Sequence, residues 1–243
     1  MSRPTGFSVP RPAATVVLLR EASPFEMLMV RRHPEMAFMG GAYVFPGGRV
    51  DDADRPADDG GVSPAIFSDL SDREEAAHRL AAVREVFEET NVVIAAADLQ
   101  PFAHWVTPEI EPIRYDTRFF LARMPAGQQP RHDERESTAL EWLSPAEAIR
   151  RFERRELLLP PPTWTTIRAL ALHPSIEAVL AWARGRRIVR ILPGFLQDAD
   201  VTMLTLPGDP LMPAIAGWDV PDETRFVLQE GGRWQPLKPP AVR

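Results

Sequence analysis

Apolar and polar residues alternate in several short runs along the first two thirds of the chain, a pattern that predicts β-strands. The expected strands cover residues 13–20, 25–31, 42–45, 102–106, 114–123 and 138–143. Residues 4, 10 and 12 are proline, which cannot donate a backbone hydrogen bond. Residues 1–12 are therefore expected to lack regular structure.

Apolar positions at three- and four-residue spacing predict a long helix over residues 72–91. Its expected core stripe consists of Ala76, Leu80, Val83 and Phe87, extended by Ala82 and Val86. Ser71 is the expected N-cap, with Glu74 three residues on as its capping-box partner. Another helix is expected from Pro145 to about residue 154. Strands interleaved with helices predict an α/β fold in which helices cover both faces of a mixed sheet.

The residues beyond Pro160 predict a separate α+β extension. Two helices are expected over residues 163–172 and 175–183, followed by strands over 187–192, 201–206 and 225–229. The chain thus divides into an irregular N-terminus (1–12), a main domain (13–160) and a C-terminal extension (161–243). Three roles remain open for the extension: covering a substrate cleft, forming the face of a homodimer, or stabilising the main domain.

Composition excludes several classes of function. The chain has 243 residues, 44% of them hydrophobic, which is enough for one large domain with an extension. The net charge of −6 and the lack of a basic stripe argue against a nucleic-acid partner. Without cysteine there can be no disulfide, zinc thiolate or thiol nucleophile.

Localisation signals are also absent from the sequence. No segment approaches the roughly 20 apolar residues that span a bilayer, so no membrane association is expected. The chain shows no signal-peptide pattern, and its last three residues, Ala-Val-Arg, differ from the peroxisomal Ser-Lys-Leu address. We therefore expect a cytoplasmic protein.

The segment Arg84-Glu85-Val86-Phe87-Glu88-Glu89 carries the strongest chemical signal. On a helix, its three glutamates fall within roughly 100° of arc, because residues three and four apart are neighbours. Like charges at this spacing repel, so a cation is expected in front of them. Oxygen-rich clusters suit hard cations such as Mg²⁺ or Mn²⁺. The alternative is a solvated helix face on which Arg84 pairs with Glu88.

An upstream glycine turn changes the weight of these alternatives. Val44-Phe45-Pro46-Gly47-Gly48-Arg49-Val50 precedes an acidic patch of Asp51, Asp52 and Asp54. Paired glycines after an apolar strand let the backbone approach a ligand closely. Together with the acidic helix, this segment resembles the signature of the Nudix hydrolases. That signature reads Gly, five residues, Glu, seven residues, Arg-Glu, an aliphatic residue, any residue, Glu-Glu, any residue and Gly.

This chain departs from the Nudix pattern at three positions. Asp54 stands five residues after Gly48 where Glu is usual, and 29 residues (55–83) separate it from Arg84 instead of seven. The extra residues fall mainly in a loop, 55–72, which costs little because loop-closure entropy grows only logarithmically with length. Asn91 replaces the last Gly, and asparagine also tolerates the left-handed conformation of a helix C-cap.

The interrupted box resembles one branch of the family, the peroxisomal coenzyme A and acyl-coenzyme A diphosphatases. Residues 105–108, 114–120 and 158–163 resemble further segments of that branch, so the likeness covers roughly residues 13–172. It implies an α/β/α sandwich and a Mg²⁺- or Mn²⁺-dependent hydrolysis of a nucleoside diphosphate derivative. The implied substrate is coenzyme A or acyl-coenzyme A, and the products are adenosine 3′,5′-bisphosphate and a phosphopantetheine compound.

Residue roles follow from the resemblance by position. It implies that Glu85, Glu88, Glu89 and the backbone carbonyl of Gly48 are metal ligands, and that Arg84 holds Glu85. A general base six residues before a tryptophan would be Glu136, with Trp142 following; Glu134 and Glu141 are rivals. Glu85 or Glu89 could activate the water instead.

Several residues are candidates for substrate contacts. Arginine matches phosphate geometry, so the phosphate candidates are Arg31, Arg32, Arg49 and Arg114. Trp105 and Tyr115 could stack on adenine, and Met36, Phe38 and Met39 could line a groove for an acyl or pantetheine arm. Two alternatives remain: the same chemistry on ADP-ribose, a dinucleotide or a nucleoside triphosphate, and a catalytically silent Nudix domain that binds a ligand.

Overall fold

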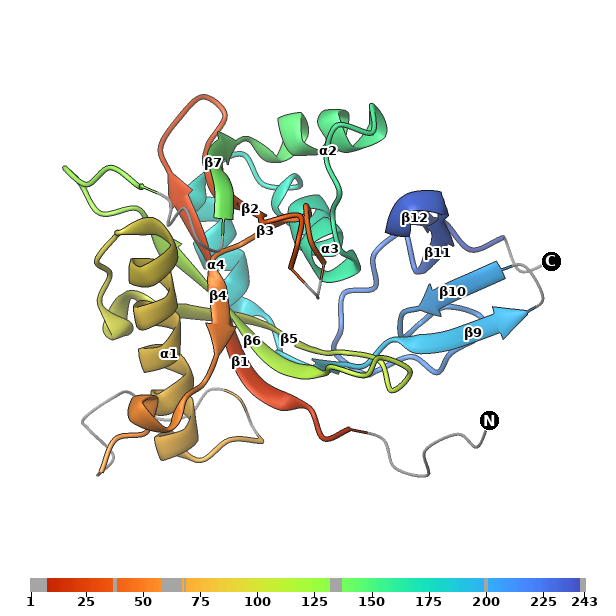
Figure 1. The fold of residues 1–243 in the computed structure, drawn as a ribbon, viewed down its shortest axis with the longest axis horizontal. Coiled ribbons are helices and arrows are strands. Elements are labelled where there is room, and N and C mark those ends of the chain that lie inside the picture. The colour runs from red at the N-terminus through yellow and green to blue at the C-terminus, as the bar shows by residue number, and fades with distance from the viewer. Residues whose placement is uncertain are drawn as a thin grey trace.

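The computed structural model describes residues 8–36, 39–57, 67, 69–131, 137–198 and 201–240, and within them an eight-stranded mixed sheet forms the centre (Figure 1). Its main path runs β3-β2-β1-β6-β5-β8, with β4 paired to β1 and β7 paired to β2. The strands are β1 (Arg11–Arg20), β2 (Glu26–Arg32), β3 (Tyr43–Val44), β4 (Gly47–Arg49), β5 (Gln100–Val106), β6 (Tyr115–Arg123), β7 (Ser137–Leu143) and β8 (Arg190–Ile191).

Strand β1 lies in the middle of the sheet and positions the glycine turn. It runs parallel to β6 along its length. On its other side, its end pairs with β2 and its start pairs with β4, where Ala14 faces Gly48. The strand begins at Arg11, earlier than predicted, because Pro12 contributes only its carbonyl, which accepts from Val50 N–H at 2.9 Å. The missing N–H of Pro12 therefore does not interrupt the sheet.

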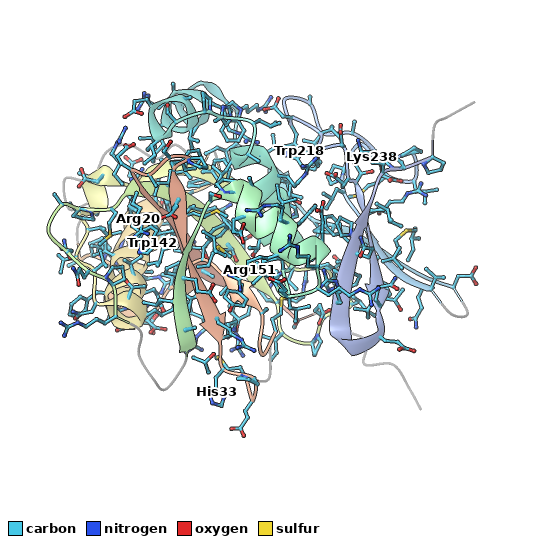
Figure 2. The ribbon with its side chains drawn as sticks, turned by 90° about the horizontal axis from the view of Figure 1, so that it is seen from above. Arg20, His33, Trp142, Arg151, Trp218 and Lys238 are labelled. Atoms are coloured by element: carbon cyan, nitrogen blue, oxygen red, sulfur yellow. The ribbon has the colours of Figure 1, made fainter. Side chains whose placement is uncertain are left out.

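Helices cover both faces of the sheet, which confirms the predicted α/β/α sandwich. Helix α1 (Asp72–Thr90) packs on one face against alternate β1 residues that include Val16 and Leu18. Helices α2 (Pro145–Glu153), α3 (Pro161–Leu170) and α4 (Ile176–Gly185) pack on the other face, which includes Val17 and Leu19. Figure 1 shows α1 apart from the other three helices. Arg20 stacks 4.4 Å above Trp142, which joins β1 to β7 (Figure 2).

Helix α1 has the predicted caps but a different buried face. The Ser71 hydroxyl accepts from Glu74 N–H, and Asn91 ends the helix at φ 56°. Leu80 and Phe87, however, are 37% and 48% exposed, so the predicted stripe was wrong at these two positions. The residues that face the sheet are mostly small: Ala77, Ala81, Ala82 and Val86. Small side chains let the helix approach the sheet closely, which the size of Leu80 and Phe87 would prevent.

The C-terminal residues form a second, antiparallel sheet in the order β12-β11-β10-β9. Its strands are β9 (Gly194–Asp198), β10 (Val201–Thr205), β11 (Arg225–Gln229) and β12 (Arg233–Leu237). Short 3₁₀ turns occur at Asp52–Asp54, Ala96–Asp98 and Glu230–Gly232. The strand predicted over 187–192 shrinks to β8, which pairs in parallel with β5. Strands β4, β9 and β12 were not predicted, because glycine or proline interrupts their apolar pattern.

The second sheet shares its core with the main domain. Leu204, Leu206, Trp218 and Phe226 belong to the same buried cluster as Val17 of β1 and Phe152 of α2. Trp218 lies between the helices and the second sheet (Figure 2). The extension is thus continuous with the main domain in packing. No helix in the described part of the chain is both long and apolar enough to cross a membrane.

Candidate active site

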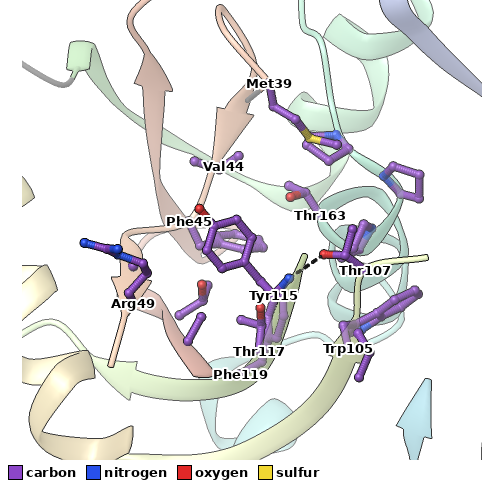
Figure 3. Close-up of a pocket in the computed structure, with 18 of the residues that line it drawn as sticks. Met39, Val44, Phe45, Arg49, Trp105, Thr107, Tyr115, Thr117, Phe119 and Thr163 are labelled. Carbon is purple, nitrogen blue, oxygen red and sulfur yellow. Dashed lines mark hydrogen bonds between the residues drawn. The ribbon is translucent and has the colours of Figure 1, made fainter. Parts of the chain in front are cut away.

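A cavity of about 460 Å³ lies where β4 and α1 meet the ends of β1, β5 and β6. Glu85, Glu88 and Glu89 line one side of it, together with Arg84 and both glycines of β4. Figure 3 shows another part of the lining, which includes Trp105, Tyr115 and Phe119 of the central strands as well as Met39 and Thr163. The cavity therefore has a charged wall formed by α1 and β4 and a largely apolar wall, and Arg32 and Glu111 add two further charged side chains to its lining.

Arg84 connects the parts of the charged wall. Its Nε and Nη2 donate to the two carboxylate oxygens of Asp54 at 3.0 and 2.9 Å. Its Nη1 donates to Glu85 and Glu88 at 2.8 and 2.9 Å, and its Nη2 also donates to the Arg49 carbonyl at 2.8 Å. The hydrogen bonds that Arg84 donates to Asp54, more than any other contact, raise the pKa of Arg84. Arg84 therefore stays positively charged, and its hydrogen bonds link α1 to β4 and to the turn after β4.

Asp54 is the anchor of this arrangement. Its side chain is only 5% exposed, and it accepts from Asp51 N–H at 2.8 Å as well as from Arg84. The bidentate pairing with a guanidinium is strong and directional. The shorter side chain at this position, where the Nudix signature has Glu, thus still reaches Arg84. The partnership was missed in the sequence because 30 positions separate the two residues.

The two glycines of β4 lie against the acidic helix and the sheet. Gly47 N–H donates to Glu89 at 3.0 Å. A Cβ at Gly48 would lie 2.4 Å from the carboxyl carbon of Glu85, and a Cβ at Gly47 would lie 2.3 Å from the Ala14 carbonyl oxygen. Only glycine allows this close approach, which brings the Gly48 backbone beside the Glu85 carboxylate.

The three glutamates supply the kind of donor that a hard divalent cation prefers. All three present oxygen donors to one cavity wall, and Glu89 is only 8% exposed. As the side chains stand, no group of three or more His, Asp or Glu residues in the described ranges is arranged to hold an ion. The reason is that Glu85 and Glu88 both turn toward Arg84 Nη1. Glu88 is half exposed, and exposed ion pairs are weak, so its rotation toward a cation would cost little.

The candidate phosphate arginines divide into two pairs. Arg32 and Arg49 line the cavity. Arg32 Nε is buried and has no hydrogen-bond partner among the described residues. Arg31 lies over the Tyr43 ring, 5.9 Å from its centre, and does not line the cavity. Arg114 is buried and donates to the carbonyls of Thr107 and Ser8 at 3.0 and 2.9 Å.

The aromatic candidates lie in the cavity. Trp105 and Tyr115 both line it, and Tyr115 N–H donates to Thr107 Oγ1 at 3.0 Å (Figure 3). Met39 lines it as well, whereas Met36 does not. Phe38 falls outside the described residues. The C-terminal segment also contributes lining residues that the sequence did not indicate: Pro193, Leu204 and Trp234.

Two of the three candidate general bases, Glu136 and Glu134, lie outside the described residues. Glu141 does not line the cavity; it accepts from Tyr43 Oη at 2.5 Å and from Arg151. Burial would raise the pKa of Glu141, but the hydrogen bonds from Arg151 and Tyr43 outweigh it and leave the pKa below its ordinary value. The pKa of Tyr43 is raised, first by burial and second by the hydrogen bond to Glu141. Glu141 is thus engaged in a structural network.

An α/β/α sandwich that sets an acidic helix against a glycine turn defines a Nudix-type hydrolase fold. The family model described as NUDIX domain matches residues 9–160. The chain belongs to the NUDIX domain family and is a Nudix diphosphohydrolase. This result confirms the family that the interrupted box indicated.

The relatives include proteins of the expected branch. Over 291 residues, the chain is 30% identical to acyl-coenzyme A diphosphatase NUDT19 of Homo sapiens, covering 85% of this chain and 77% of that protein. The corresponding protein of Gallus gallus is 27% identical, over 84% of this chain and 80% of that protein. The crystal structure of a NUDIX hydrolase from Alicyclobacillus acidocaldarius matches with a TM-score of 0.63 and 26% identity, covering 72% of this chain and 97% of that one. The chain thus resembles the acyl-coenzyme A diphosphatases, as the sequence indicated.

Proposed function

We propose that this protein hydrolyses the diphosphate linkage of coenzyme A or acyl-coenzyme A with the help of Mg²⁺ or Mn²⁺. The products would be adenosine 3′,5′-bisphosphate and a phosphopantetheine compound. The observation that carries the proposal is that Glu85, Glu88 and Glu89 line one cavity wall beside the Gly47-Gly48 turn. The similarity to proteins named acyl-coenzyme A diphosphatase supports the choice of substrate.

In this proposal, Glu85, Glu88, Glu89 and the carbonyl of Gly48 hold the cation. When bound, a divalent cation neutralises phosphate charge, polarises phosphorus and lowers the pKa of water. Arg84 and Asp54 act as positioning residues, because their paired hydrogen bonds hold α1 against the turn after β4. Glu88 must exchange its contact with Arg84 for one with the cation, while Asp54 keeps Arg84 in place.

Arg32 and Arg49 are the phosphate contacts that we propose. Both line the cavity, and the unpartnered Arg32 Nε is a donor whose burial is otherwise unfavourable. Arg114 is not included, because its guanidinium already serves two backbone carbonyls. Arg31 is not included, because it lies over Tyr43 outside the cavity lining.

The reaction is an attack of water on one phosphorus of the diphosphate. The bond from that phosphorus to the bridging oxygen breaks, and the leaving phosphate keeps the electron pair. Glu136 remains our proposed general base for the water proton, and Glu89, which lines the cavity, is the alternative. The buried Glu89 is oriented by Gly47 N–H, so it has a defined position in the cavity.

The experiment compares wild type with Glu88→Gln and Glu89→Gln on coenzyme A, acyl-coenzyme A, ADP-ribose, a dinucleotide and a nucleoside triphosphate. Replacing a residue that only supports a metal ligand costs about 10- to 100-fold in affinity or activity, so we expect a larger loss in kcat/KM here. Glu74→Gln is the matched control, because Glu74 lies in the first turn of the same helix and does not line the cavity.

A titration with Mn²⁺ by calorimetry gives an independent readout. Wild type and Glu74→Gln should bind the ion, and the double variant Glu88→Gln/Glu89→Gln should bind it at least about tenfold more weakly. Equal binding by all three proteins would contradict the metal assignment. Cleavage of ADP-ribose without cleavage of any coenzyme A compound would contradict the substrate.

A further inference from the structure

We propose that the C-terminal sheet forms a binding wall for the pantetheine and acyl arm of the substrate, an inference that rests on the proposed function. Pro193, Leu204 on β10 and Trp234 on β12 line the same cavity as the three glutamates. All three residues lie beyond residues 9–160, the part that matches the NUDIX domain. The family domain alone would therefore leave this side of the cavity without its wall.

Strand register shows which face of the second sheet is used. Residues directly opposite on paired strands point to the same face. Leu204 is opposite Phe195 and Phe226, and Trp234 is opposite Leu228. These five residues of the face are apolar, and Leu204 and Phe226 are buried in the core shared with the main domain. Trp234, which is partly buried and packs against this core, borders the cavity from the same face.

The chemistry of this wall differs from that of the acidic wall. The residues contributed by 160–163 and by the second sheet, Pro160, Pro161, Pro162, Thr163, Pro193, Leu204 and Trp234, carry no charge. Moving an ionised phosphate from water onto such a surface releases no free energy. Moving an aliphatic chain onto it is favourable, and the free energy released is roughly proportional to the apolar area that the chain buries. The two walls therefore match a substrate with a diphosphate at one end and an apolar arm at the other.

The start of α3 supports this assignment. The first N–H groups of a helix usually attract anions. Here the first two helical residues, Pro161 and Pro162, have no N–H, and the Trp164 N–H is bonded to the Pro160 carbonyl at 2.9 Å. The first two positions of the helix thus present proline rings to the cavity, and Thr163 adds an uncharged side chain. This arrangement favours an apolar arm over a second phosphate.

The wall is held in place by contacts next to Trp234. The Arg233 guanidinium donates to the Leu157 carbonyl at 2.9 Å and also to the Phe152 carbonyl. The same guanidinium stacks on the Phe152 ring, 4.1 Å from the ring centre. Arg168 of α3 also pairs with Glu223 at 3.3 Å. These contacts join the second sheet to the segments that carry the rest of the apolar wall. The binding surface is therefore formed before the substrate arrives, which reduces the entropy cost of binding.

The experiment measures kcat/KM of Trp234→Ala on a long-chain acyl-coenzyme A and on ADP-ribose, using the inhibition constant of ADP-ribose if it is not cleaved. ADP-ribose carries the adenosine diphosphate half without the arm. Loss of apolar contact area equal to a methylene or two changes specificity about 10- to 200-fold. We expect a loss of at least about tenfold for the acyl compound, mainly in KM, and less than about twofold for ADP-ribose.

Two further variants separate binding from structural damage. Trp234→Leu keeps an apolar side chain and should retain more of the selectivity than Trp234→Ala. Leu196→Ala removes an exposed apolar residue of β9 that does not line the cavity, and it should leave both substrates unchanged. Circular dichroism melting of each variant checks that the fold persists.

The outcomes distinguish this inference from the proposed function. Equal losses on both compounds would place Trp234 against the adenosine half or assign it a purely structural role, and either result overturns the arm assignment. Unchanged kinetics in Trp234→Ala would do the same. A wild-type enzyme that cleaves no coenzyme A compound overturns both proposals, whereas an active wild type with unselective variants overturns only this one.

Discussion

At the scale of single residues, the site depends on how closely β4 approaches α1. Gly48 has no side chain between its backbone and the Glu85 carboxylate, and Arg84 and Asp54 hold the helix against this turn. Two neighbouring glycines experience different surroundings, because Gly48 faces the flexible end of a side chain and Gly47 faces the backbone of β1. This difference makes their substitutions separable by experiment.

We expect Gly48→Ala to impair catalysis without much loss of stability. The new methyl group would lie 2.4 Å from the Glu85 carboxyl carbon, so that carboxylate must move. A displacement of about 1 Å in an active site can cost roughly 100-fold in rate. Turnover of acyl-coenzyme A gives the first readout, and the melting temperature, which should change little, gives the second.

Gly47→Ala is the contrasting variant. Its methyl group would lie 2.3 Å from the Ala14 carbonyl oxygen, which belongs to the central strand and cannot rotate away. Overpacking of this kind typically costs about 1–3 kcal/mol, so we expect the melting temperature to fall as well. A Gly48→Ala protein that melts as early as Gly47→Ala would contradict the proposed separation of the two roles.

At the scale of elements, a buried ion pair fixes the start of α1. Glu75 is fully buried and accepts from Arg79 Nε and Nη2 at 3.1 and 2.8 Å and from Phe67 N–H at 3.1 Å. Arg79 also donates to the carbonyls of Ala96 and Leu99 at 3.2 and 2.7 Å. The pair thus connects the helix to the end of the 55–72 segment and to the turn before β5. The site at the other end of α1 depends on this anchorage.

We expect Glu75→Gln to destabilise the protein by about 3 kcal/mol, because removing one charge leaves the other buried without compensation. Glu74→Gln is the control; Glu74 is more exposed, and substitutions of this type usually stay within about 0.5 kcal/mol. Urea unfolding gives both values. If the two variants had equal midpoints, the pair would not carry the anchorage that we assign to it.

At the scale of the whole molecule, the two sheets should unfold together, because one buried cluster contains residues of both. Asp209, in the segment between β10 and β11, is the most informative probe of the C-terminal part. Its buried carboxylate accepts from Arg225 at 2.9 and 3.1 Å, from Thr224 Oγ1 at 2.7 Å and from Leu211 N–H at 2.9 Å. Burial would raise the pKa of Asp209, but the hydrogen bonds, that of Arg225 first, hold the pKa below its ordinary value.

A depressed pKa in the folded state stabilises the protein above the ordinary aspartate value and loses that effect as the pH falls through the folded-state pKa. We therefore expect Asp209→Asn to lower stability at pH 7 by about 1–3 kcal/mol. The difference from wild type should shrink below about pH 4. Melting curves between pH 7 and pH 2.5 measure it.

The same curves test whether the molecule unfolds as a unit. Asp209→Asn should shift a single transition, even though the residue lies far along the chain from α1. Two separate transitions would contradict the shared core. A stability difference that grows as the pH falls would contradict a lowered pKa of Asp209 in the folded state. Asp222→Asn is a suitable control, because its ion pair with Lys238 is exposed on both sides and such pairs contribute little.

Features whose signals lie within a few residues of each other could be predicted from the order of the amino acids. The Ser71 cap, the Asn91 cap, the acidic face of α1 and each half of the interrupted Nudix box are of this kind, because local backbone geometry relates neighbouring residues directly. These features were sufficient to indicate the family, the α/β/α fold and the residues that could do the chemistry.

Contacts between distant segments could be seen only in the folded molecule. It showed that Asp54 pairs with Arg84 across 30 positions, that Arg114 serves backbone carbonyls, and that Leu80 and Phe87 face outward. It also brought Trp234 to the cavity that Glu89 lines. The physical reason is that each of these contacts depends on the packing of two segments at once, and the pattern of either segment alone does not specify its partner.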